Sequence, residues 1–217
     1  MRRVRAVAVA LTCSILSSAA SAQSGGFGVC KPVAQRTQEI GCWIIAEHAV
    51  GRIEAPNVYW HLDAYPSMAA AERARGPRGT VLRALGRSWL MTIERQDWRP
   101  KREGEHVADI GPLVVKPGRS YAALFMEAVT TPGMTSAVHR HSGPEAWYTT
   151  AGETCLETPS GTIIGRAGAP AIVPEGPPMY LTAIGSETRR AITLILHDAK
   201  RAPTTEEHDW KPKGLCK

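Results

Sequence analysis

The sequence lacks the signatures of several common enzyme classes. It contains no G-x-S-x-G elbow around a serine nucleophile, no P-loop and no glycine fingerprint for dinucleotide binding. It also contains no C-x-x-C pair, which argues against a dithiol redox centre and against a zinc knuckle. The sequence therefore gives no support for a serine hydrolase, for an enzyme that binds nucleotides through a P-loop or a dinucleotide fingerprint, or for a thiol oxidoreductase.

The chain also lacks a concentrated basic surface. Its formal charge is +6, but Arg2, Arg3 and Arg5 contribute half of it, and the other basic residues are scattered among acidic ones. There is no lysine-rich stripe and no patch where aromatic and basic residues alternate, so nucleic-acid binding has little support. Composition is ordinary for a globular protein, and 217 residues are enough for one large domain or two small ones.

Residues 1–22 are typical of a secretory signal peptide. A positively charged start and an apolar segment at 6–19 precede Ala20-Ser21-Ala22, which matches an A-x-A cleavage signal. The apolar segment is diluted by serine and threonine and is shorter than the roughly 20 apolar residues of a membrane span. We therefore expect cleavage before Gln23, a periplasmic or secreted protein, and no membrane association afterwards.

The cysteines agree with export. Four remain after the expected cleavage, an even number in a chain bound for an oxidising compartment. Four cysteines allow three pairings, and the sequence does not choose among them. A Cys30–Cys42 bond within one short segment would leave Cys155 and Cys216 to attach the C-terminal tail. The alternative is that one or both pairs are free buried thiols.

Residues 29–98 predict the order strand, strand, helix, strand, strand. Apolar and β-branched residues favour strands at 42–48, 58–65, 79–85 and 88–94. An alanine-rich segment follows Ser67, a good N-cap, and predicts a short helix that ends near Gly76. We expect a small α+β N-terminal region at 23–105, which ends in a charged linker.

From residue 106 onward the pattern changes to short strands alone. Glycine- and proline-containing turns separate nearly all of them, and no helix intervenes. Such a series is typical of a jelly-roll β-barrel, expected at 106–200 and followed by a C-terminal tail at 201–217. The predicted strands are 106–115, 121–131, 136–141, 145–158, 161–167, 169–175, 179–185 and 189–198.

One short stretch predicts a metal site. His139 and His141 are two residues apart, which places both side chains on one face of a strand. The turn-forming residues 142–144 follow, and Glu145 opens the next strand, so that its carboxylate can meet both imidazoles. Two neutral nitrogens and one anionic oxygen make a 2-His-1-carboxylate site for a divalent transition metal. Without metal, a desolvated Glu145 would tend to take up a proton and could act as a general acid or base.

The same stretch resembles a known family. From Gly133 to Gly152 the spacing is G-x5-H-x-H-x3-E-x6-G, which resembles the first signature motif of the cupin superfamily. Residues 168–176, with the spacing G-x5-P-x-G, resemble the second motif. The resemblance covers roughly the C-terminal half of the chain. It implies the jelly-roll barrel and a metal ion, Fe, Mn, Cu, Ni or Zn, at the two histidines and the glutamate.

The second motif departs from the family pattern at one ligand position. A third histidine is expected where this chain has Met179. Its thioether is a soft, weak donor that would suit copper, or the side chain fills space in the pocket. We also predict that Trp147, Tyr148 and Tyr180 form pocket walls, although aromatic residues at such positions are more often core, and that His197 lines the pocket mouth.

The resemblance implies two alternative functions. One is a metal-dependent enzyme that acts on a small polar or anionic molecule, because the family includes dioxygenases and isomerases. A divalent ion with these ligands has a net charge near +1, which favours a small anionic or chelating ligand. The other is a non-catalytic exported module that binds a small molecule, and the fold alone does not choose between them. Cupin relatives often pair through strand edges, so a homodimer is also expected.

Overall fold

The computed structural model describes residues 26–28, 30–101 and 104–216. The predicted signal peptide at 1–22 lies outside these residues. Strands predominate over helix in the described part of the chain, which confirms the prediction of a mainly β protein. Of the helices in these ranges, none combines the length and the apolar character that crossing a membrane requires.

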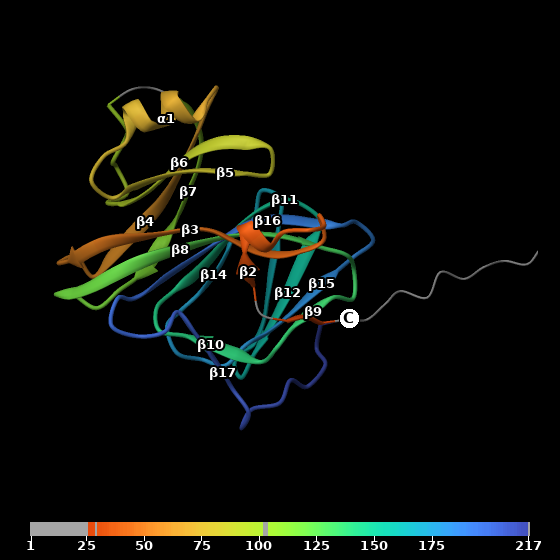
Figure 1. The fold of residues 1–217 in the computed structure, drawn as a ribbon. Coiled ribbons are helices and arrows are strands. Elements are labelled where there is room, and N and C mark those ends of the chain that lie inside the picture. Colours follow the sequence, from red (N-terminus) through yellow and green to blue (C-terminus); the bar gives the residue numbers. More distant parts are fainter. Residues whose placement is uncertain (1–25, 29, 102–103, 217) are drawn as a thin grey trace, which may run out of the picture.

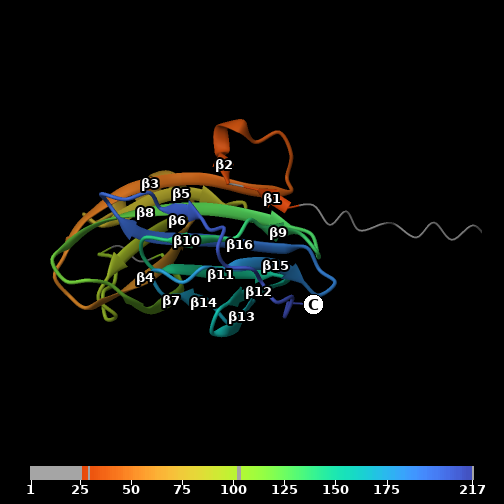
Figure 2. The same cartoon turned by 90° about the horizontal axis from the view of Figure 1, so that it is seen from below.

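Two facing sheets enclose the interior of the C-terminal part, as expected of a jelly roll (Figures 1 and 2). A two-stranded sheet of β10 (His139–His141) and β17 (Thr204–Glu206) lies at one end. The first large sheet has the order β14 (Ala171–Val173), β11 (Glu145–Ala151), β16 (Arg189–Asp198), β8 (Arg119–Thr130), β3 (Gly41–Ile53) and β2 (Lys31–Pro32). The second has the order β1 (Gly26–Gly28), β9 (Thr135–Ser136), β15 (Tyr180–Ile184), β12 (Glu153–Thr158) and β13 (Gly161–Arg166).

A separate four-stranded sheet lies beside the barrel and carries the helix (Figure 1). The Ser67 hydroxyl oxygen accepts a hydrogen bond from the Ala70 N–H at 3.2 Å, which begins the helix as predicted. The helix buries Ala71 and Ala74 against Tyr65 and Leu90, because two turns of helix need such packing to persist. The sheet order is β5 (Gly79–Ala84), β6 (Arg87–Glu94), β4 (Asn57–Tyr65) and β7 (Glu105–Val114); the helix is α1 (Met68–Ala74), and a 3-10 turn, η1, spans Val33–Gln35.

The four-stranded sheet packs against the outer face of the six-stranded sheet. On β8, Phe125 faces outward and packs with Trp60 of β4 at 6.1 Å between ring centroids. The neighbouring Leu124 and Met126 face inward and contact a second cluster that includes Cys42. Because successive strand residues alternate between faces, burial of both faces explains why β8 reads as a nearly continuous apolar run.

Hydrogen bonding crosses the division predicted at residue 105. Strand β3, from the predicted N-terminal region, pairs along its length with β8 of the barrel sheet. Strand β7, from the predicted barrel, pairs instead with β4 of the small sheet. The division therefore does not separate the sheets. The physical reason is the length of β3 and β8, because both strands extend beyond the barrel and underlie both layers (Figure 1).

Two of the predicted strands are each divided in two. Residues 145–158 form β11 and β12, with Gly152 between them at a φ of 64°. A Cβ on Gly152 would lie 2.7 Å from the Cα of Arg189, so both the turn and the close approach require glycine. Residues 136–141 likewise divide into the end of β9 and the short β10. Strand periodicity does not reveal where a chain leaves one sheet and enters another, as it does between β11 and β12.

Two disulfides join the four cysteines, and one of them attaches the C-terminal tail to the barrel. Cys30 bonds to Cys42, and Cys155 of β12 bonds to Cys216. The buried carboxylate of Glu157 accepts backbone N–H groups of Lys213 and Leu215, which holds the same part of the tail. The tail is thus fixed to the barrel both covalently and by hydrogen bonds.

Candidate metal centre

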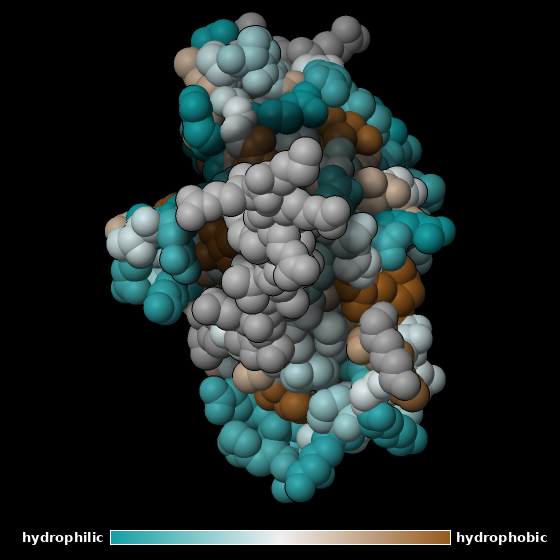
Figure 3. All heavy atoms as spheres, turned by 90° about the vertical axis from the view of Figure 1, so that its right-hand side faces the viewer, coloured by the Kyte–Doolittle hydropathy of each residue, from teal (hydrophilic) through white to brown (hydrophobic). Residues whose placement is uncertain are grey.

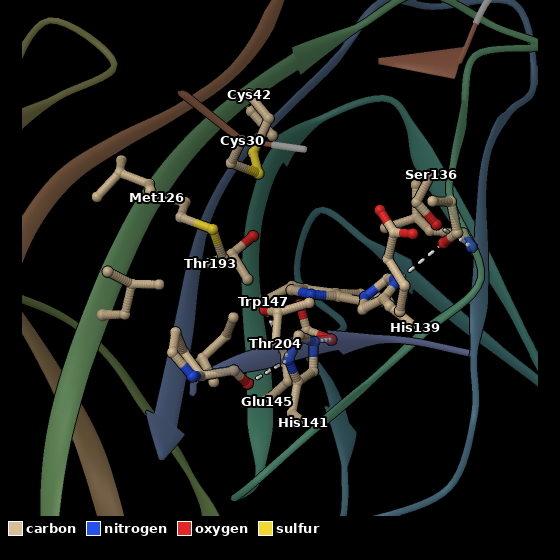
Figure 4. A pocket seen from close by; sticks show the side chains of 18 of the residues that line it. Cys30, Cys42, Met126, Ser136, His139, His141, Glu145, Trp147, Thr193 and Thr204 are labelled. Carbon is tan, nitrogen blue, oxygen red and sulfur yellow. Dashed lines mark hydrogen bonds and ion pairs between the residues drawn. A yellow bond between two sulfur atoms is a disulfide. The ribbon is translucent and has the colours of Figure 1, made fainter. Parts of the chain in front are cut away.

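The three residues predicted to bind metal come together inside one end of the barrel. One ligand atom from each of His139, His141 and Glu145 lies within 4.8 Å of the others. The two imidazole centroids are 4.8 Å apart, and Nε2 of His141 is 3.4 Å from Oε2 of Glu145. Figure 4 shows the side chains of His141 and Glu145 close together, with the Cys30–Cys42 disulfide across the cavity.

The turn between the histidines and the glutamate is locked against β16. A Cβ at Gly143 would collide with the carbonyl oxygen of Leu196, so this position requires glycine. The Ser142 hydroxyl donates to the Ala202 carbonyl at 2.8 Å, and the Leu196 N–H donates to the Pro144 carbonyl at 2.9 Å. These contacts fix where β10 ends and β11 begins, and therefore fix Glu145 relative to the imidazoles.

Backbone carbonyls orient both imidazoles for metal binding. Nδ1 of His139 lies 2.8 Å from the Ala137 carbonyl oxygen, and Nδ1 of His141 lies 2.9 Å from the Pro203 carbonyl oxygen. Since a carbonyl oxygen only accepts, each Nδ1 carries the hydrogen, and the lone pair of each neutral ring is on Nε2. This is how metal-binding histidines are commonly held by their second ring nitrogen.

The charges at the site suit a cation. Burial lowers the pKa of His139, and the neighbouring His141 lowers it further, so His139 is neutral at neutral pH. Burial alone would raise the pKa of Glu145, but the positive charge of the imidazoles when they are protonated, and hydrogen bonding from His141, lower the pKa below its ordinary value. The sequence shows the desolvation that favours a proton on Glu145 but not how close the imidazoles lie, and their proximity shifts the pKa the other way.

Two buried polar atoms at the centre have no hydrogen-bond partner among the described residues. They are Nε2 of His141 and Oε2 of Glu145. With the His141 ring neutral, both atoms are acceptors and cannot hydrogen-bond to each other; a protonated His141 would instead form an ion pair with Glu145 across 3.4 Å. Unpaired buried polar atoms are costly, and a divalent cation between them would satisfy both. The donor set of two imidazole nitrogens and a carboxylate therefore fits a transition metal.

A cavity of about 270 Å³ adjoins the three residues. Its walls are largely apolar, and the C-terminal tail contributes Pro203 and Thr204 at the end where the histidines lie. Figure 4 shows Met126 and Thr193 on the wall between the disulfide and the metal-binding group. The main apolar contributors are Ile44, Leu124, Met126, Leu181 and Ile195.

Of the predicted pocket residues, Trp147 lines this cavity and the others lie elsewhere. Tyr148 projects from the opposite face of β11 and packs on Trp89, with ring centroids 6.0 Å apart. Nδ1 of His197 lies 3.0 Å from the Asp198 carbonyl oxygen, and Nε2 is 3.4 Å from Glu47. Tyr180 is half-buried on β15, opposite Glu157.

Met179 lies beside the metal-binding residues without lining the cavity. Its backbone N–H and carbonyl exchange hydrogen bonds with His139 at 2.8 and 3.1 Å. Directly opposed residues of such a pair project from the same face, and the buried Met179 packs with Trp147 and Leu181. The thioether therefore belongs to an apolar cluster next to the site rather than to the walls of the pocket where it was expected.

Replacing Met179 with histidine is expected to tighten metal binding. The new imidazole would project from the same face as His139, and the exchange roughly conserves volume. Dissociation of zinc from the purified variant, measured with a chromogenic chelator, should be slower than from the wild type. Met179→Leu, which adds no nitrogen, is the control. Equal rates for the histidine variant and the wild type would place position 179 out of reach of the ion.

Sequence reasoning missed a buried charge that lines this cavity, Arg189. Its side chain is 1% exposed and lines the cavity, with Cζ 5.6 Å from the centroid of the Trp147 ring. Burial lowers its pKa to about 10, so it remains protonated at neutral pH. The only signal in the sequence is a pair of arginines before an apolar run. The second, Arg190, faces outward and pairs with Glu39 at 2.6 Å.

No protein-family model matches this chain, and no curated protein does. Solved structures similar to it include a cupin-like protein from Thermotoga maritima, 17% identical with a TM-score of 0.36 over 39% of this chain and 64% of that one. The polyketide cyclase RemF from Streptomyces resistomycificus is 18% identical with a TM-score of 0.34, over 42% and 63% of the two chains. Oxalate decarboxylase from Bacillus subtilis is 20% identical with a TM-score of 0.32, over 42% and 25%. This chain thus spans less than two thirds of these structures, and no activity follows from them.

Proposed function

We propose that this chain is an exported metalloprotein in which His139, His141 and Glu145 hold one divalent transition-metal ion for chemistry on a small anionic molecule. One observation carries the proposal. Nε2 of His141 and Oε2 of Glu145 are buried, face each other at 3.4 Å and have no hydrogen-bond partner in the described chain. A cation is the group that both acceptors can bind at once.

The residues around the centre have separate roles in this proposal. The carbonyls of Ala137 and Pro203 keep the imidazole lone pairs on Nε2, and Trp147 with the apolar walls excludes water from the bound molecule. With three protein ligands, coordination positions remain for a substrate oxygen or for O₂, and the ion would supply Lewis-acid or redox chemistry there. The enzyme would be of the oxygenase or isomerase type.

One observation favours the alternative, a non-catalytic exported module that binds a small ligand. Among the described residues that line the cavity, the only carboxylate besides Glu145 is that of Glu206, which is solvent-exposed. A general acid or base separate from the metal ligands is therefore lacking on these walls. Reactions that need proton transfer by a second buried carboxylate are disfavoured, whereas ligand binding needs none.

Elemental analysis of protein purified without oxygen separates the two functions. About one iron, manganese or copper ion per chain would favour the enzyme, and oxygen consumption in the presence of candidate small acids would then define the reaction type. A metal-free protein that still binds small molecules would favour the module. The expected export has support from the two disulfides and the sequence of residues 1–22, and the mature N-terminus of the secreted protein tests it directly.

Metal retention is expected to persist below the pH at which an ordinary histidine takes up a proton. Protons compete with the ion for the imidazole lone pairs, and an ordinary imidazole has a pKa of about 6.5. Burial and His141 lower the pKa of His139, and the pKa of Glu145 is lowered too, so both ligands stay deprotonated into more acidic solution.

Dialysis at stepped pH followed by elemental analysis measures this retention. Circular dichroism at each step should show that the protein is still folded where metal is lost. A loss midpoint at or above about 6.5 would mean that burial does not protect these ligands from protons.

A further inference from the structure

Arg189 occupies the same cavity as the metal-binding residues, toward the opposite end of β16. In the pairing of β11 with β16, Glu145 stands opposite Ile195, whereas Arg190 stands opposite Ala151. Arg189 and Ile195 are on the same face of β16, and both line the cavity. The cavity therefore has a carboxylate with two imidazoles toward one end and a guanidinium toward the other.

The guanidinium lacks partners for its in-plane donors. Nε and Nη2 of Arg189 are buried and have no hydrogen-bond partner among the described residues. The contact with Trp147, with Cζ 5.6 Å from the ring centroid, gives these N–H groups no hydrogen-bond acceptor. The charge of Glu145 attracts the guanidinium, but these two donors have no hydrogen-bond partner, and unsatisfied buried donors of a charged group are expensive. A carboxylate accepts two parallel N–H bonds from that edge.

Charge balance points to a ligand with two negative charges. The cavity holds one carboxylate, Glu145, and one guanidinium, Arg189, while Glu206 lies exposed at the mouth. With neutral imidazoles these buried charges cancel, and a bound divalent ion then adds two positive charges. Net charge in a low-dielectric interior is unfavourable, so a dianion would restore neutrality.

We propose that the cavity takes a small dicarboxylate, with one carboxylate on the metal ion and the other on the guanidinium of Arg189. The apolar walls between the two ends, which include Trp147, Met126 and Ala128, suit a methylene chain. The metal end of this inference rests on the proposed function, whereas the guanidinium end rests on Arg189 alone. The substrate or ligand class is therefore a linear diacid.

Calorimetric titration of the zinc-loaded protein with straight-chain diacids from succinate to pimelate tests the inference. Affinity should pass through an optimum with chain length, and the best diacid should bind about 10- to 100-fold more tightly than its monomethyl ester. Arg189→Gln should remove that difference without loss of zinc, because it takes a positive charge away from the neighbourhood of the ion. Arg190→Gln is the matched control, because the neighbouring arginine faces outward, and it should behave as the wild type.

Equal affinity of the wild-type protein for the diacid and its monoester would overturn the inference, and this result needs no variant. A second arm uses metal-free protein, with hexanoate compared with hexanamide. A preference for hexanoate that Arg189→Gln abolishes would support the anion site even if elemental analysis finds no metal and the proposed function fails. No such preference in the wild type would overturn the role of Arg189 while leaving metal binding intact.

Discussion

Replacing His141 with alanine is expected to reduce bound metal from about one ion per chain to a trace, with the barrel still folded. His141 supplies one of three protein ligands and is the residue whose Nε2 has no other partner. Loss of a group that merely orients a ligand typically weakens metal affinity 10- to 100-fold, so loss of the ligand itself should cost more than about 100-fold. Elemental analysis and competition with a chelator measure both quantities.

The control is His208→Ala, because that side chain is exposed and outside the site. The His141 variant also loses the hydrogen bond to the Pro203 carbonyl, which should lower the free energy of unfolding by only about 1 kcal/mol. A cooperative thermal transition should therefore remain. Full metal content in the His141 variant would contradict the metal centre, and gross unfolding would show that the imidazole is chiefly structural.

Removing the Cys155–Cys216 disulfide is expected to give the largest loss of stability. The bond closes a loop of 61 residues, and the chain-entropy relation gives about 4 kcal/mol for a loop of that length. In a protein of this size the midpoint of thermal unfolding should fall by roughly 8–16 °C. The double variant Cys155→Ala/Cys216→Ala, compared with the wild type by calorimetry, measures the change.

The Cys30–Cys42 bond provides the comparison for this measurement. Its cysteines are 12 residues apart, and the same relation gives about 3 kcal/mol. Removing the Cys155–Cys216 bond should therefore lower the midpoint of thermal unfolding more than removing the Cys30–Cys42 bond does. If removing the longer bond leaves the unfolding midpoint unchanged, the tail is held by its hydrogen bonds to Glu157 rather than by the covalent link.

The cluster of candidate metal ligands could be predicted because its chemistry is local. His139, His141 and Glu145 lie within seven residues of sequence, and a strand–turn–strand arrangement brings them together once Gly143 permits the tight approach to β16. Arg189 could not be predicted, since neighbouring residues on a strand face opposite sides and nothing in an Arg-Arg pair marks which one is inside. Burial of a charge is decided by the packing of distant elements.

The same reasoning explains which features of the fold could be predicted from the sequence. Element types followed from periodicity and caps, as in the helix that begins after Ser67. Strand partners did not follow, because pairing depends on contacts far apart in sequence. Thus β7 was expected in the barrel and pairs with β4, whereas β3 was expected outside it and pairs with β8.

The sharing of β3 and β8 between two layers has a consequence for how the molecule unfolds. Phe125 and Met126 are consecutive residues, yet one belongs to the core beneath the small sheet and the other to the cavity wall. Neither the small sheet nor the barrel can lose its packing without exposing one face of β3 and β8. The protein should therefore melt as a single cooperative unit, and a fragment beginning at residue 106 would lack the strand that completes its own sheet.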